Sequence, residues 1–253
     1  MRIGLYYFSG TGNTRLVAGE FKTVFASLDL ECELIPLEKI TQKTRDISFT
    51  DYDLVGLGFP VHAFDAPRIV YDFVKLLPVK RVRYFLFKTA GSDFLLGGST
   101  HRLRSALASK GWTLAHESFF EMPPNVGACP SQERVDQIVA QARENVSVAV
   151  EEILAEKHIV LDDKPIQRAF SFINHFETIG CFFGSSNWFA DENCTLCGKC
   201  MRNCPTRNIS LTEDKVVFGH SCVLCLRCWW NCPARALRHR HLNWALLKKL
   251  YKL

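Results

Sequence analysis

The chain has 253 residues, of which 47% are hydrophobic and 23% charged, and its formal net charge is +5. This composition excludes a disordered or fibrous protein and leaves room for one domain of ordinary size plus a small one. No run of about 18 apolar residues is present, and the short apolar run before Ser9 lacks the features of a secretory signal, so we expect neither a membrane span nor a signal peptide.

The first part of the chain alternates strand and helix patterns. Short apolar runs predict strands at residues 2–8, 32–35, 53–59, 83–88 and 112–116. Apolar residues at helical spacing predict helices from Asn13, after Pro67, at 100–110 and at about 131–157. Five strands alternating with helices predict a doubly wound parallel α/β sheet that ends near residue 157.

The turn after the first strand is rich in glycine, hydroxyl and amide groups: Ser9, Gly10, Thr11, Gly12, Asn13 and Thr14. It lacks the lysine of a P-loop, and Arg15 stands where a dinucleotide motif has its third glycine. The backbone N–H groups at a helix start favour an anion, and these side chains add donors. We therefore expect a single phosphate here, with ordinary helix capping as the alternative.

Residues 158–189 form a connector that is rich in aromatic side chains: Phe170, Phe172, Phe176, Phe182, Phe183, Trp188 and Phe189. A flexible linker would be polar and rich in glycine and serine. We therefore expect the connector to pack between two domains.

Residues 190–235 contain an internal repeat of two cysteine runs. Each has the pattern Cys-x2-Cys-x2-Cys-x3-Cys-Pro, and the second lies 28 positions after the first. This is the spacing of bacterial two-cluster ferredoxins, in which three cysteines of a run bind one [4Fe–4S] cluster and the fourth binds the other. The rule predicts one cluster on Cys194, Cys197, Cys200 and Cys232, and a second on Cys222, Cys225, Cys228 and Cys204.

Zinc is the alternative, because four-thiolate zinc sites also use Cys-x2-Cys pairs. Two identical runs, each closed by Cys-Pro, favour the clusters. Cluster ligands have to stay reduced, so we expect a reducing compartment, the cytoplasm.

The last segment, residues 236–253, mixes basic residues with leucines and aromatics, and no acidic residue follows Asp214. The pattern predicts a basic amphipathic helix. We expect it to dock on the first domain, with partner binding or contact with a membrane surface as alternatives. No nucleic-acid-binding motif is present.

Taken together, these motifs resemble the family of flavodoxin–ferredoxin fusions. The resemblance implies a flavodoxin-like FMN-binding domain at 1–157, then a small α+β ferredoxin-like domain with two [4Fe–4S] clusters. The turn at Ser9–Thr14 looks like the FMN-phosphate loop of flavodoxins. Two loops after the third and fourth strands would line the isoalloxazine ring: Pro60, Val61, His62, Ala63 and Phe64, then Thr89, Ala90, Gly91, Ser92, Asp93, Phe94, Gly97 and Gly98.

Neither loop contains the tryptophan or tyrosine that flavodoxins often stack on the flavin. Either the stacking is weaker or one flavin face stays open, and His62 is then a candidate catalytic residue.

The leading hypothesis is a redox protein that moves electrons between the clusters and FMN, with a low-potential donor or acceptor protein as partner. The alternative is an FMN-dependent reductase acting on a small oxidised substrate. A third hypothesis makes the clusters structural.

Overall fold

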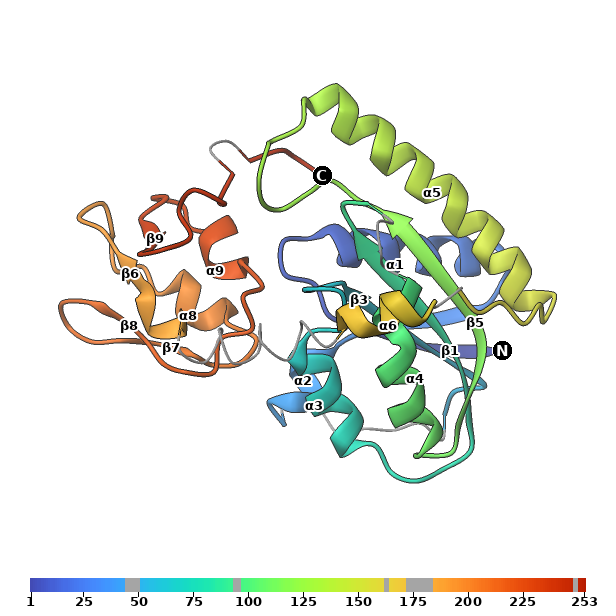
Figure 1. Cartoon of the computed structure of the whole chain (residues 1–253). Helices are drawn as coiled ribbons and strands as arrows, with labels where there is room; N and C mark the ends of the chain where they lie inside the picture. The colour runs from blue at the N-terminus through green and yellow to red at the C-terminus, as the bar shows by residue number, and fades with distance from the viewer. Residues whose placement is uncertain (44–50, 93–96, 162–163, 172–183, 248–249) are drawn as a thin grey trace.

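A five-stranded parallel sheet forms the centre of the larger domain (Figure 1). The computed structural model describes residues 1–43, 51–92, 97–161, 164–171, 184–247 and 250–253. The sheet has the order β2-β1-β3-β4-β5. Its strands are β1 (Arg2–Tyr7), β2 (Glu31–Pro36), β3 (Leu54–Pro60), β4 (Val82–Ala90) and β5 (Trp112–Glu121). This is the strand order of flavodoxin-like doubly wound folds, and each of the five strands overlaps a predicted one.

Helices cover both faces of the sheet, because alternate side chains of each strand point to opposite faces. One face carries α1 (Asn13–Ser27) and α5 (Gln132–Leu154), and the other carries α2 (Leu37–Thr41), α3 (Arg68–Leu76) and α4 (His101–Ala108). Before α4 lies a 3-10 turn, η1 (Gly97–Thr100), which packs against α6 (Pro165–Ser171).

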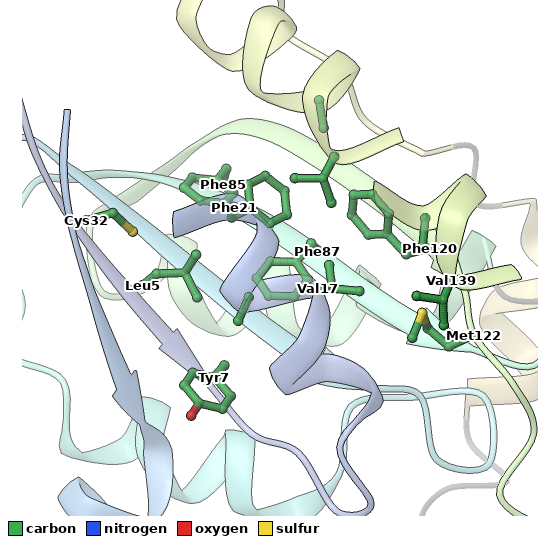
Figure 2. Packing of buried hydrophobic residues seen from close by; sticks show 14 of the residues in the cluster. Leu5, Tyr7, Val17, Phe21, Cys32, Phe85, Phe87, Phe120, Met122 and Val139 are labelled. Atoms are coloured by element: carbon green, nitrogen blue, oxygen red, sulfur yellow. The ribbon is translucent and has the colours of Figure 1, made fainter. Parts of the chain in front are cut away.

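Aromatic rings fill the first of these layers. Phe21 of α1 lies 5.4 Å from Phe85 and 5.0 Å from Phe87, measured between ring centroids (Figure 2). The neighbouring strand makes room for these rings with glycine, since a Cβ on Gly58 would lie 1.9 Å from the ring of Phe87. Gly58 of β3 therefore leaves the space that the Phe87 ring of β4 occupies.

The smaller domain lies beside the sheet, and its described residues form two short antiparallel strand pairs and two short α-helices (Figure 1). Its elements are η2 (Ser185–Asn187), β6 (Trp188–Ala190), α8 (Lys199–Asn203), β7 (Ile209–Leu211), β8 (Val216–Phe218), α9 (Arg227–Trp230) and β9 (Leu237–His239). β6 pairs antiparallel with β9, and β7 with β8. Trp188 and Phe189, expected in the connector, thus belong to the same sheet as β9.

The sequence repeat is also a backbone repeat. Positive φ angles recur 28 positions apart at three pairs: Leu196 and Leu224, Gly198 and Leu226, and Arg207 and Arg235. Positive φ is rare for residues with a side chain, so three matched pairs show that the two cysteine runs fold the same way.

The helix predicted over 236–253 is wrong for the described residues of that segment. After β9 the chain makes turns, and Leu246 then forms a β-bridge with Val126 of the large domain. Leu237–His239 pair with β6 instead of joining a helix, and residues 240–245 form turns. Leu246, Leu247 and Tyr251 are buried instead, and the tail crosses back to the start of α5 (Figure 1).

Two further expectations concern the chain as a whole. Among the described helices, none combines the length and apolar character that a membrane span requires. Four of the connector aromatics, Phe172, Phe176, Phe182 and Phe183, lie outside the described residues.

Candidate functional site

A crevice of about 1650 Å³, counting the space open to solvent, lies where the carboxyl ends of β1, β3, β4 and β5 meet. Residues from all three predicted FMN loops line it: Ser9, Gly10, Thr11, Asn13, Thr14, Pro60, Val61, His62, Ala63, Phe64, Thr89, Ala90, Gly91 and Ser92. Doubly wound folds bind ligands at this edge. Gly98 instead packs against the backbone of Gln167, and Asp93 and Phe94 lie outside the described residues.

The turn at residues 9–14 has the features of an anion site. Ser9 is 7% exposed, and its Oγ has no hydrogen-bond partner among the described residues. Gly12 precedes α1 with a φ of 125°, and no described side chain caps the helix. A buried hydroxyl without a partner is costly, and uncapped N–H groups at a helix start attract anions. The turn therefore fits a phosphate group.

Neighbouring loops hold this turn in place. Thr11 Oγ1 donates to Asn125 Oδ1 at 2.8 Å, and the Thr14 and Thr89 hydroxyls lie 2.8 Å apart. The Tyr251 hydroxyl donates to the Pro123 carbonyl at 2.9 Å and also bonds Asn125. The end of the tail thus bonds to the loop after β5 that holds the turn at residues 9–14, a contact that the sequence pattern did not specify.

The loop after β3 contains a strained two-residue turn. The backbones of His62 and Asp65 exchange hydrogen bonds of 2.9 and 3.0 Å across Ala63 and Phe64, whose φ angles are 40° and 65°. Such turns favour glycine or asparagine, and a side chain in this region costs on the order of 1–3 kcal/mol. The strained turn brings Ala63 and Phe64 to the crevice.

Asp65 stabilises the turn and does not line the crevice. Its buried carboxylate accepts from Ala66 N at 2.7 Å and Tyr71 Oη at 2.7 Å, and it pairs with Arg102 at 3.0 Å. Burial raises the pKa of Asp65, and these partners oppose the rise. The carboxylate therefore anchors the loop to α3 and α4.

His62 joins the loop to the smaller domain. Its ring hydrogen-bonds the backbone of Val223, next to Cys222, and burial lowers the pKa of His62 to about 4. Burial therefore favours the uncharged ring at neutral pH, and the catalytic role of His62 stays a prediction.

The eight cysteines of the two runs line two separate hollows. Cys194, Cys197, Cys200 and Cys232 line the first, which we call the outer hollow because Cys197 is exposed. Cys204, Cys222, Cys225 and Cys228 line the second, the inner hollow. In each set the fourth cysteine comes from the other run.

Backbone N–H groups point at the sulfurs in both hollows. Asn208 N lies 3.2 Å from Cys204 Sγ, Leu224 N lies 3.3 Å from Cys222 Sγ, and Ala236 N lies 3.3 Å from Cys232 Sγ. Hydrogen bonds of this kind stabilise thiolate ligands. Burial alone would keep the inner thiols protonated, since it raises the pKa of Cys222 to about 11 and of Cys225 to about 12.

No preformed metal-ion site is found in the described part of the chain. No three His, Cys, Asp or Glu side chains of the described residues lie close enough together to hold one metal ion. All ten described cysteines are free.

The inner hollow and the crevice share a wall. Cys225 lines both, together with Leu224, Leu226 and Trp188. The approach is close enough that a Cβ on Gly10 would lie 2.1 Å from the Cys225 carbonyl oxygen. Gly10 therefore allows the phosphate turn and the cysteine loop to touch.

Arg227, which lies inside the second cysteine run, clamps the two domains. Its guanidinium donates to the Ser9 carbonyl at 2.6 Å, pairs with Glu38 at 2.6 Å, and lies 5.6 Å from the ring centre of Phe8. Gln42 adds a second link, donating to the Cys204 and Pro205 carbonyls at 3.1 and 2.8 Å. The only sequence signal for Arg227 was its place between two predicted ligands.

Strand order and a crevice at the carboxyl edge define the first domain as flavodoxin-like. No protein-family model and no curated protein sequence matches the chain.

Solved structures of flavin proteins resemble part of the chain. Oxidised flavodoxin 2 from Bacillus cereus is 20% identical with a TM-score of 0.41, covering 60% of this chain and 99% of that one. A flavodoxin from the domain Archaea is 12% identical with a TM-score of 0.41, covering 61% and 99%. A flavone reductase is 14% identical with a TM-score of 0.44, covering 63% and 65%. The fold assignment rests on the strand order, because these scores are low.

Proposed function

We propose that this chain is a redox protein that moves electrons between two [4Fe–4S] clusters and a bound FMN. Clusters carry single electrons and a flavin carries one or two, so together they convert one-electron into two-electron chemistry. The observation that carries the proposal is the position of Cys225, which lines both the inner hollow and the crevice.

The phosphate turn supports FMN as the flavin. The unpartnered Ser9 Oγ and the uncapped start of α1 suit a single phosphate. The strained turn at Ala63 and Phe64 supplies one wall of the crevice beyond it. This chain's residues would bind the phosphate, position the ring system and keep water from it by docking the smaller domain over the crevice.

The two sets of four cysteines support the clusters. Each set surrounds one hollow, and each draws its fourth member from the other run, as the two-cluster ferredoxin rule requires. The backbone repeat gives both hollows the same N–H donors to sulfur.

The geometry also supports an order in which electrons pass through the two cysteine hollows. The inner hollow borders the crevice, whereas the outer hollow is lined by the exposed Cys197 and Lys199, and the exposed Arg202 donates to the Cys197 carbonyl beside it. We propose the outer site as the contact point for a donor or acceptor protein, and its basic residues favour an acidic partner.

The triple variant Ser9→Ala, Thr11→Ala and Thr14→Ala tests the phosphate site. It removes three hydroxyl groups from the turn and touches no cysteine, so we expect anaerobically purified protein to lose FMN and keep its iron. Flavin fluorescence and iron analysis of the variant provide the readout. Full flavin content would rule out the phosphate turn as the binding site.

A second function, reduction of a small oxidised substrate at the flavin, has one observation in its favour. The crevice extends beyond the three FMN loops to an apolar end lined by Trp188, Leu242, Ala245 and Leu246. A reductase should bind a compound there that changes the flavin absorption spectrum saturably. A pure carrier should show no such change and should exchange electrons with generic ferredoxin partners.

A further inference from the structure

Asn208 breaks the symmetry between the two cysteine hollows. The position 28 residues later is Ala236, and the two share their backbone environment: each N–H points at a cysteine sulfur, at 3.2 and 3.3 Å. Each carbonyl also accepts from a residue at a matched position, Gly219 N at 2.8 Å for Asn208 and Asp191 N at 2.8 Å for Ala236. Only the side chain differs, an amide at the inner hollow and a methyl at the outer one.

The orientation of the Asn208 amide is settled by its partner. Its Oδ1 accepts from the backbone N–H of Ser221 at 2.5 Å. A backbone N–H can only donate, so the atom facing it must be the oxygen, and the nitrogen must be on the other side. Asn208 is 7% exposed, and its Nδ2 has no acceptor among the described residues.

No acceptor of the described residues, cysteine sulfur included, lies within hydrogen-bonding distance of the Asn208 amide nitrogen. Asn208 lines the inner hollow together with Cys204, Cys222, Cys225 and Cys228. Two buried N–H donors without a partner among the described residues line this hollow, Asn208 Nδ2 and Trp188 Nε1, whereas none of the described residues around the outer hollow has one. Leaving a buried donor unpaired costs about 1–3 kcal/mol.

Accepting a hydrogen bond from the Ser221 N–H does not by itself require an asparagine at position 208. At the matched position in the other half, the N–H of Asn193 is accepted by the carboxylate of Asp191, at 3.1 Å. An aspartate at 208 could accept from Ser221 in the same way. The amide adds the donor that a carboxylate lacks.

We propose that the Asn208 side-chain amide donates a hydrogen bond to sulfur of the cluster in the inner hollow and raises that cluster's reduction potential. This inference rests on the proposed function, because it requires the clusters to be bound. Hydrogen bonds to cluster or ligand sulfur stabilise the more negative, reduced state. The site beside the flavin crevice is thereby made the better electron acceptor.

Redox titration of the full-length protein, followed by electron paramagnetic resonance of the reduced clusters, tests this. Asn208→Ala copies the residue at position 236, and Asn208→Asp keeps the acceptor for Ser221 but removes the donor. We expect one of the two midpoint potentials to fall in both variants, further in Asn208→Asp, which also adds negative charge. The other potential should stay unchanged, and the exposed Asn193→Ala should leave the inner cluster's potential where it is.

Unchanged potentials in both variants, with full iron content, would overturn the inference and leave the proposed function standing. A wild-type protein without iron would overturn the proposed function itself. If both variants lose iron, wild-type protein labelled with 15N in the asparagine side-chain amide decides: a nitrogen hyperfine coupling on a reduced cluster supports the hydrogen bond, and its absence refutes it.

Discussion

The clamp formed by Arg227 makes a quantitative prediction about the contact between the two domains. Arg227→Met removes the ion pair to Glu38 and the hydrogen bond to the Ser9 carbonyl while keeping most of the apolar stem. The two charged side chains are only 17% and 18% exposed. Glu38 Oε2 already has no partner among the described residues, so the variant leaves a largely buried carboxylate without its cation.

Removing one partner of a buried ion pair costs about 3–5 kcal/mol, and the residual exposure places this pair at the lower end. A cost of about 3 kcal/mol raises the population of the undocked state roughly 10²-fold. Hydrogen–deuterium exchange of α9 in the folded protein measures this, because its amides are exposed when the helix leaves the first domain. We expect exchange about 100-fold faster than in the wild type.

The repeat supplies the control. Lys199 occupies the matching position in the first cysteine run and is exposed, so Lys199→Met should leave the exchange of α9 unchanged. The double variant Arg227→Met with Glu38→Gln should recover part of the loss, because no charge is then left buried. An increase below about threefold in Arg227→Met would refute the view that this residue holds the domains together.

Two further predictions concern the contacts around the phosphate turn. Tyr251→Phe removes the hydroxyl that bonds Pro123 and Asn13. At about 1 kcal/mol per net hydrogen bond, we expect FMN to bind about five- to tenfold more weakly in fluorescence titrations. Unchanged affinity would contradict a role for the tail in FMN binding. Gly10→Ala places a Cβ against the Cys225 carbonyl, so we expect a loss of about 1–3 kcal/mol and a lower thermal midpoint. Gly19→Ala, inside α1 with no atom within 4 Å of its Cβ, should raise stability by about 0.5–1 kcal/mol; equal midpoints for both variants would refute the tight contact.

Most of the large domain could be predicted from apolar periodicity, and the exceptions have physical causes. The strand predicted at 112–116 continues to Glu121. Its extension contains Glu117, which is fully buried and paired with Lys88 at 3.3 Å and Arg104 at 2.7 Å. A search for apolar runs reads charged residues as exposed loop residues. The buried charges of Glu117 and its partners therefore ended the predicted strand too early.

Short elements were missed because they carry too little signal. The helix α2 has five residues and α6 has seven, which is less than two turns of amphipathic pattern. In the tail, by contrast, a helix was predicted where the described residues form none, because the leucines and basic residues there match helical spacing. Pairing with β6 and burial of Leu247 and Tyr251 on the large domain decided its conformation.

Sequence patterns indicated those parts of the candidate site that lie within one short motif. They did not indicate the contacts between segments that are far apart in the chain. The phosphate turn and the cysteine spacing are each written in one short run of residues. The bond from Arg227 to Ser9 joins residues 218 positions apart, and the ring of His62 meets Val223. Such contacts depend on how the domains dock, which no single run of sequence contains.

The central claim is that this chain binds two iron–sulfur clusters and one FMN. Cofactor analysis of the anaerobically purified, full-length protein tests it most directly, by counting iron, acid-labile sulfide, zinc and flavin per chain. We predict about eight iron, about eight sulfide and one FMN for two cubane clusters and one flavin. Colourless protein, or protein that contains zinc in place of iron and no flavin, would contradict the account.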